Sequence, residues 1–176
     1  MKWPPEELIY SKQRLILMNR LCTCLIFGCL AVARGIAQSP GVETFSSEQV
    51  SALEKSLRAE ADRSNGTATG PIAKYPGFYT MLVFRDKGGE VEIHNQFDEI
   101  MIVVGGKATV VTGGTPQNVR TLKPGELRGT SIEGGMPNPM EKGNMVHIPV
   151  NTPHQVFVPA GGSVTYIDVK IEHPKS

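Results

Sequence analysis

The stretch GGEVEIHNQFDEI, residues 88–100, places one histidine among several carboxylates in a segment that otherwise has the pattern of a β-strand. In an extended chain Glu92 and His94 share one face, while Val91 and Ile93 share the other. If the apolar pair faces the core, the polar face meets water and no metal binds. If His94 points inward instead, this stretch supplies half of a buried metal site. The spacing alone is compatible with both interpretations.

A second histidine, His154, follows the rigid turn NTP. Pro153 fixes its own φ, and Asn151 is among the few residues besides glycine that tolerate a left-handed conformation. Such a turn holds His154 at a set angle, and metal coordination benefits from ligands that are oriented in advance. The two other histidines beyond residue 40 are predicted elsewhere, His147 on an outer strand face and His173 in solvent.

Short segments rich in Val, Ile, Thr and aromatic residues follow one another from Tyr75 onward, separated by Gly, Pro and Asn. They are residues 78–85, 90–94, 99–104, 107–112, 126–132, 145–149, 154–158 and 163–171. With no helix-length periodic run between them, they predict an all-β sandwich or barrel. Gly105 and Gly106 predict a hairpin between the third and fourth segments. The stretch 113–143 is predicted to be looser, with one strand inside it.

A single amphipathic helix is predicted before the strands. Ser46 is a good N-cap, and Gln49 three residues later completes a capping box. Val50, Leu53 and Leu57 recur at helical spacing and form one apolar stripe. We expect this helix to pack on the outside of the strands that follow it.

The first 38 residues have the features of a secretory signal peptide. Basic residues precede the apolar run LCTCLIFGCLAVA, residues 21–33, which is shorter than the about 20 residues that span a bilayer. Small residues follow it, which predicts cleavage near Ala37 and export to the periplasm or medium, with no stable membrane span afterwards. The alternatives are an uncleaved anchor that includes residues 15–17, and a start of translation at Met18. All three cysteines lie in this run, so the mature chain would have no disulfide framework.

Charge argues against one class of partner. The chain has 18 Lys and Arg residues against 17 Asp and Glu residues, and the basic residues form no run and do not alternate with aromatic ones. A nucleic-acid-binding surface needs such a basic patch. The composition therefore excludes nucleic acid as the expected partner.

The two histidine segments together resemble the motifs of the cupin superfamily. The first cupin motif runs Gly, five residues, His, one, His, three or four, Glu, six, Gly. Gly88 and His94 match its opening, and Glu99 and Gly106 match its close. Gln96 replaces the second histidine, and its gap to Glu99 is one residue short.

The second cupin motif begins with Gly, five residues and Pro, and Gly143 and Pro149 match it. Asn151 stands where the motif has a second glycine, and His154 is its histidine. Val158 takes the place of the asparagine that closes the motif. Both motifs occur in order among short strands, and the resemblance extends over roughly residues 75–171.

Two features of the first motif stay open at this point. A second register restores the motif's spacing: it runs Glu92, one residue, His94, four residues, Glu99. This register puts Glu92 in the place of a histidine. Asp98 to Gly105 also fits the spacing from Glu to Gly. Sequence therefore does not choose between Glu92 and Gln96, or between Asp98 and Glu99, as the side chains that face the interior.

The resemblance implies a fold and a division of the chain. It implies an all-β cupin double-stranded β-helix, a jelly-roll barrel, with the one N-terminal helix packed outside. The chain then divides into a signal peptide over residues 1–38, the helix and a linker over 39–70, and the barrel over 71–176. Barrels of this type commonly pair, so the resemblance also implies a homodimer.

The resemblance further implies a divalent metal inside the barrel, held by His94, Gln96, Glu99 and His154. Two imidazoles and a carboxylate suit Fe, Mn, Ni, Cu or Zn and leave positions open for a small-molecule ligand. Arg128 is a candidate to hold an anionic substrate, with Tyr166 a further candidate in the substrate-binding pocket.

Three functions are compatible with these features. The first is an exported metal-dependent enzyme of the oxygenase, isomerase or lyase type that acts on a small oxygen-bearing molecule. The second is a module that binds a small ligand without turning it over. The third is a structural cupin that has lost its metal.

Overall fold

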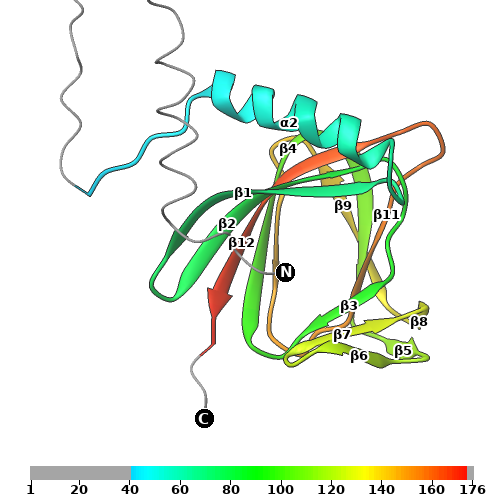
Figure 1. Cartoon of the computed structure of the whole chain (residues 1–176). Helices are drawn as coiled ribbons and strands as arrows, with labels where there is room; N and C mark the ends of the chain where they lie inside the picture. Colours follow the sequence, from blue (N-terminus) through cyan, green and yellow to red (C-terminus); the bar gives the residue numbers. More distant parts are fainter. Residues whose placement is uncertain (1–40, 174–176) are drawn as a thin grey trace, which may run out of the picture. The chain divides into compact units, whose positions relative to one another are not determined.

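The computed structural model describes residues 41–173, and within them one helix and twelve strands (Figure 1). The chain divides into two compact units, 1–43 and 44–176, and everything below concerns the second unit. The predicted signal peptide lies outside the described residues, so its prediction stays untested. The helix formed within residues 41–173 is not long and apolar enough to cross a membrane.

The strands carry the chain through an antiparallel sheet and a small separate ribbon. The helix is α2, Ser47–Ala61. The strands are β1 Thr67–Tyr75, β2 Phe78–Arg85, β3 Val91–His94, β4 Phe97–Thr112, β5 Thr115–Gln117, β6 Arg120–Lys123, β7 Glu126–Gly129, β8 Ser131–Glu133, β9 Met136–Glu141, β10 Met145–Ile148, β11 His154–Phe157 and β12 Val164–Glu172.

Ten strands form one sheet in the order β1-β2-β12-β4-β11-β3-β7-β6, with β9 and β10 also paired to β4. β5 and β8 form the ribbon. Every strand pair is antiparallel. Figure 1 shows the sheet curling around an interior, with α2 lying along its outside. The predicted all-β cupin-type barrel with one outer helix is therefore confirmed.

The helix forms and docks as its sequence predicts. The Ser46 side chain accepts a hydrogen bond from the backbone N–H of Gln49. In turn, the Gln49 side chain accepts one from the backbone N–H of Ser46. The apolar stripe then packs on the outer face of β1 and β2. Its cluster is Leu57, Ala61, Ala68, Leu82 and Phe84, with Val50, Leu53, Ile72, Val104 and Ile167 packed against it.

The hairpin predicted at Gly105 and Gly106 is wrong, because both residues lie inside the 16-residue strand β4. Gly106 has a φ of +69°, and a Cβ there would lie 2.0 Å from the carbonyl oxygen of Ser163. The register of β12 against β4 also shifts close by, between Thr165 and Tyr166. The two glycines thus let one long strand bend and pass from β12 to β11 and β9, which helps the sheet to curl.

Strand β1 lies in the segment that the sequence predicts as a linker, and it begins before residue 71, the predicted start of the barrel. Gly70 and Pro71 look like strand breakers, but β1 is an edge strand and its register shifts between Pro71 and Ala73, where proline is tolerated. The stretch 113–143 is likewise more regular than predicted, since it holds β5 to β9 instead of one strand.

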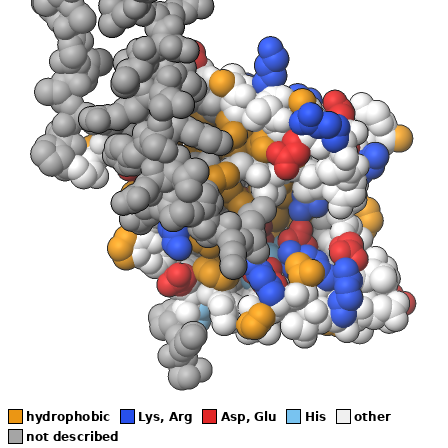
Figure 2. Space-filling model, viewed as in Figure 1, with side chains coloured by type: hydrophobic (Ala, Val, Ile, Leu, Met, Phe, Trp, Pro, Cys, Tyr) orange, Lys and Arg blue, Asp and Glu red, His pale blue; other side chains and the backbone are white. Residues whose placement is uncertain are grey.

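The interior of the barrel is apolar in one part and polar in another. The apolar part is Val83, Met101, Val103, Ala108, Val110, Met140, Ile148, Val156, Val164 and Tyr166. Buried polar side chains include His94, Glu99, His154, Asp168 and Lys170. On the outside, Figure 2 shows acidic and basic side chains interspersed with hydrophobic ones on the face in view.

Candidate metal centre

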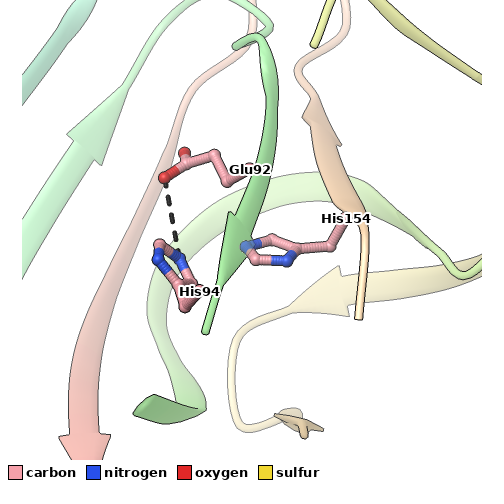
Figure 3. A group of neighbouring side chains, drawn as sticks. All are labelled: Glu92, His94 and His154. Atoms are coloured by element: carbon pink, nitrogen blue, oxygen red, sulfur yellow. Dashed lines mark ion pairs between the residues drawn. The ribbon is translucent and has the colours of Figure 1, made fainter. Parts of the chain in front are cut away.

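The two motif histidines meet inside the barrel. His94 ends β3 and His154 begins β11, and their ring centroids lie 5.2 Å apart. Glu92 lies two residues before His94 on the same face of β3, and it pairs with His154 in the β11–β3 register. Figure 3 shows the side chains of Glu92, His94 and His154 pointing toward one another. One ligand atom from each of the three lies within 4.8 Å of the others, close enough to hold one metal ion.

Glu99 completes the group from β4. Its Oε2 lies 3.0 Å from His154 Nε2 and 3.3 Å from His94 Nε2, and its side chain is buried. Asp98 next to it accepts a hydrogen bond of 2.8 Å from the backbone N–H of Val150. The structure thus turns Glu99 toward the histidines and uses Asp98 in a loop contact.

The orientation of His94 is set by β7. The register pairs His94 with Glu126, and His94 Nδ1 lies 2.8 Å from Glu126 Oε2. Burial acts to raise the pKa of Glu126, but the hydrogen bond from His94 together with the charges of His94, Lys170 and Arg128 outweighs it, and the pKa is lowered. An ionised carboxylate can only accept, so we assign the Nδ1 proton to His94. Its Nε2 then faces the centre of the site.

The turn before His154 is tied to the other motif. Asn151 has a φ of +63°, the left-handed conformation predicted for it, and its N–H donates to the carbonyl oxygen of His94. His154 Nδ1 lies 3.1 Å from the carbonyl oxygen of Thr152, so we assign its proton to that nitrogen. The ring therefore presents Nε2 to Glu99.

Two arginines hold Glu92. Arg85 Nη2 lies 2.6 Å from Glu92 Oε1, and Arg128 Nη2 lies 3.1 Å from Oε2. Burial opposes ionisation, but these charges outweigh it and lower the pKa of Glu92 to about 2. Arg85 also donates from Nε to the buried hydroxyl of Tyr166 at 3.1 Å. Glu92 is therefore a fixed carboxylate whose Oε2 lies 3.9 Å from His94 Nε2.

A buried lysine also reaches the centre. Lys170 Nζ lies 2.8 Å from Glu99 Oε1, 2.8 Å from His94 Nε2 and 3.6 Å from Asp168 Oδ2. Burial disfavours the charged forms of both Glu99 and Lys170. The ion pair between them acts in the opposite direction, and the pKa of Glu99 is lowered well below its usual range while that of Lys170 is raised. The amine of Lys170 is the stronger base, so we assign the proton between it and His94 Nε2 to Lys170.

Asp168 lies on the same face of β12 as Lys170, two residues before it. Burial, together with the charge of Glu99, raises the pKa of Asp168 well above its usual range. Its Oδ1 has no hydrogen-bond partner within residues 41–173.

The donor set fits a divalent metal ion. His154 Nε2 and Glu99 Oε2 are buried, face each other and have no hydrogen-bond partner in the described part of the chain. Unpaired buried polar atoms are costly, and a cation between them would satisfy both. Two imidazole nitrogens and carboxylate oxygens are ligands that suit first-row divalent metals.

The structure brings together three of the four predicted ligands, His94, Glu99 and His154. Gln96 is exposed in the turn after β3, packs against Gly125 and accepts a backbone hydrogen bond from His173, so it lies outside the group. Glu92 takes the inward position instead, as in the alternative register.

Arg128 and Tyr166, the two residues predicted to bind substrate, make their contacts with other side chains of the site. Arg128 pairs with Glu92 and Glu126, and Tyr166 contacts Arg85. Their predicted contact with substrate stays untested. His147 and His173 are exposed, as predicted.

Sequence reasoning missed Glu126, Arg85, Asp168 and Lys170. Asp168 and Lys170 did carry a signal, because they continue the parity of the buried residues Val164 and Tyr166 along β12. Charged side chains at core-facing positions of a strand are rare unless they are paired. That parity points to a buried polar contact, although it does not name the partner.

No family model and no curated protein matches the chain. Solved structures do resemble it. They include a putative mannose-6-phosphate isomerase from Ralstonia eutropha, with 16% identity over 62% of this chain and 88% of that one and a TM-score of 0.45. KdgF from Halomonas sp. is 18% identical over 63% of this chain and 84% of that one, with a TM-score of 0.46.

A third is a Cupin 2 conserved barrel domain protein from Salinispora arenicola, with 18% identity over 61% of this chain and 77% of that one and a TM-score of 0.43. These likenesses concern the fold at most. The curled antiparallel sheet of this chain and the meeting of its two histidine segments at one buried site are observed in its own structure.

Proposed function

We propose that this chain is an exported cupin that binds a divalent metal inside the barrel and acts on a small oxygen-bearing molecule. The observation that supports this most is the meeting of His94, His154 and Glu99, where two buried ligand atoms lack a hydrogen-bond partner in the part of the chain that the structure describes. Glu92 is the fourth ligand in this proposal, in place of Gln96.

A metal held there supplies Lewis acidity toward a carbonyl, enediol or similar oxygen. The protein's own part is to hold the ligand atoms. Glu126 and the carbonyl oxygen of Thr152 fix the two imidazoles with Nε2 inward. Arg85 and Arg128 keep Glu92 ionised. Such partners behind the ligands commonly decide both orientation and affinity.

Metal analysis tests the proposal directly. Protein purified without a histidine tag is expected to contain about one equivalent of a first-row divalent metal, and His154→Ala is expected to lose it while keeping its circular dichroism spectrum. His147→Ala, at an exposed position on β10, is the matched control and is expected to keep the metal. Metal-free wild-type protein that also fails to take up added Mn²⁺, Fe²⁺, Ni²⁺, Cu²⁺ or Zn²⁺ would contradict the proposal.

A second candidate is a barrel that binds a small ligand without turnover. The observation that favours it is the position of Lys170, whose Nζ lies 2.8 Å from His94 Nε2, the atom that a catalytic metal would need. Turnover of a panel of small diketones and catechols by the metal-loaded protein separates an enzyme from a binding module, since a binding module gives calorimetric heats with no product.

Export and dimerisation belong to the same proposal and have their own tests. N-terminal sequencing of protein secreted by an expression host is expected to begin near Gln38. Light scattering on the mature protein is expected to give the mass of a dimer.

A further inference from the structure

The metal proposal leaves the role of Lys170 in this site unexplained. We propose that the Lys170 ammonium and the divalent metal are alternative occupants of the site. The ammonium holds His94 and Glu99 in the metal-free protein and has to leave them when a metal binds. This inference rests on the proposed metal binding and adds the residue that opposes it.

The first argument is the single lone pair of His94. Its Nδ1 carries the proton donated to Glu126, so only Nε2 can bind a metal. Lys170 Nζ lies 2.8 Å from that same nitrogen and occupies the position a metal would take there. One lone pair serves one partner, and His94 therefore cannot bind the ammonium and a metal together.

The second argument is charge balance. In the site three carboxylates already face three cationic side chains. They are Glu92 with Arg85 and Arg128, Glu126 with Arg128, and Glu99 with Lys170. A divalent ion at the histidines would lie beside the Lys170 ammonium in a buried, weakly screened environment, where like charges repel strongly. Removing the ammonium from Glu99 relieves that repulsion and frees an oxygen for the metal.

The third argument is that the ammonium has a place to go. Asp168 Oδ2 lies 3.6 Å from Lys170 Nζ, and the buried Oδ1 of Asp168 has no hydrogen-bond partner among residues 41–173. The two residues share one face of β12, and the flexible stem of a lysine allows its head to move without any change in the backbone. A small swing toward Asp168 thus exchanges an oxygen of Glu99 for an oxygen of Asp168.

The consequence is a site that stays closed and neutral until a metal competes successfully for it. Lys170 lowers the apparent metal affinity, because each binding event has to displace a hydrogen-bonded ammonium. Lys170 also stabilises the metal-free fold, because its removal would take the ammonium away from the buried Glu99 carboxylate.

Calorimetric titration of chelator-treated proteins with Zn²⁺ tests the inference. Lys170→Met keeps the length of the side chain and removes its charge, and is expected to bind Zn²⁺ about tenfold to a hundredfold more tightly, the worth of a hydrogen bond to a charged group. Lys170→Arg retains a cation and is expected to stay close to wild type or weaker. Lys107→Met, an exposed position on β4, is the matched control and is expected to change nothing.

The outcomes separate this inference from the proposed function. Equal or weaker Zn²⁺ binding by Lys170→Met than by wild type overturns the inference and leaves metal binding intact. Binding by Lys170→Met alone overturns metal binding by the natural chain and supports the inference. Binding by neither protein overturns both.

A measurement on the wild type covers the case in which Lys170→Met does not fold. In ¹⁵N-labelled protein a buried, hydrogen-bonded lysine ammonium exchanges slowly enough to be followed by NMR. Zn²⁺ is expected to shift the Lys170 Nζ signal and the His94 Nε2 signal together at one equivalent. A His94 signal that moves while that of Lys170 stays unchanged overturns the inference.

Discussion

Two buried regions lie on opposite faces of the same strands and are held together in different ways. Toward α2 the sheet presents Leu82, Phe84 and Ile167, which join an apolar layer with the helix. Toward the interior the neighbouring positions Arg85 and Asp168 belong to the polar site. The alternation of a β-strand is enough to separate the two regions.

The difference separates the region that contributes most to stability from the region that holds the candidate metal site. The apolar layer is held by burial, which is non-directional and scales with area. The polar interior is held by directional contacts between buried charges, an arrangement that adds little to stability when complete and costs much when one partner is lost. What it provides is a set of ligand atoms aimed at one point.

The largest stability effect is expected in the apolar layer. Leu57→Ala removes a buried side chain on α2 and should lower the free energy of unfolding by about 2–5 kcal/mol. Leu122→Ala, at an exposed position, should change it by less than about 0.5 kcal/mol. Urea unfolding of the metal-free proteins measures both. Zn²⁺ affinity of folded Leu57→Ala should equal that of wild type, and a large change in affinity would show that the two regions are not independent.

A smaller effect, on metal binding instead of on stability, is expected at Glu92. Glu92→Gln removes the ligand charge and should weaken Zn²⁺ binding about tenfold, which corresponds to about 1.4 kcal/mol. Gln96→Ala is the paired test, and it should leave affinity unchanged because Gln96 is exposed. Calorimetry that finds the reverse order would return Gln96 to the ligand set and remove Glu92 from it.

The smallest effect is expected where a polar contact crosses the apolar layer. Thr165 is buried, and its hydroxyl donates to Glu54 Oε1 on α2 at 3.0 Å. Thr165→Val keeps the shape and should lower the free energy of unfolding by about 1 kcal/mol, with no effect on Zn²⁺ binding. Thr121→Val, at an exposed position on β6, is the control. Unchanged stability of Thr165→Val in urea would mean that the helix is held by apolar contact alone.

Local patterns predicted the parts of the fold that depend on near neighbours in the chain. The capping box at Ser46 and the apolar stripe of α2 were confirmed, as was the left-handed Asn151 before His154. Such features involve residues a few positions apart, so their physics is contained in a short window. The errors fall where tertiary context overrides that window, at the edge strand β1 and at the bend in β4.

The choice between Glu92 and Gln96 shows the same limit at the site. Both lie two positions from His94, and both are compatible with a motif. Strand β3 ends at His94 and the chain turns at Asn95, so Glu92 keeps the strand's parity and stays inside while Gln96 leaves it. The end of a strand depends on its partners β7 and β11, which are distant in sequence.

The sequence by itself predicted an all-β barrel, its outer helix and the two motif histidines as candidate ligands, because strand patterns, capping and motif spacing are local properties. The tertiary structure alone decided that the Nζ of Lys170, 76 residues from His94 along the chain, lies 2.8 Å from His94 Nε2. It did so because β12 pairs with β4 and brings Lys170 opposite Glu99. The proposed competition between an ammonium and a metal depends on that pairing, and no short window of sequence contains it.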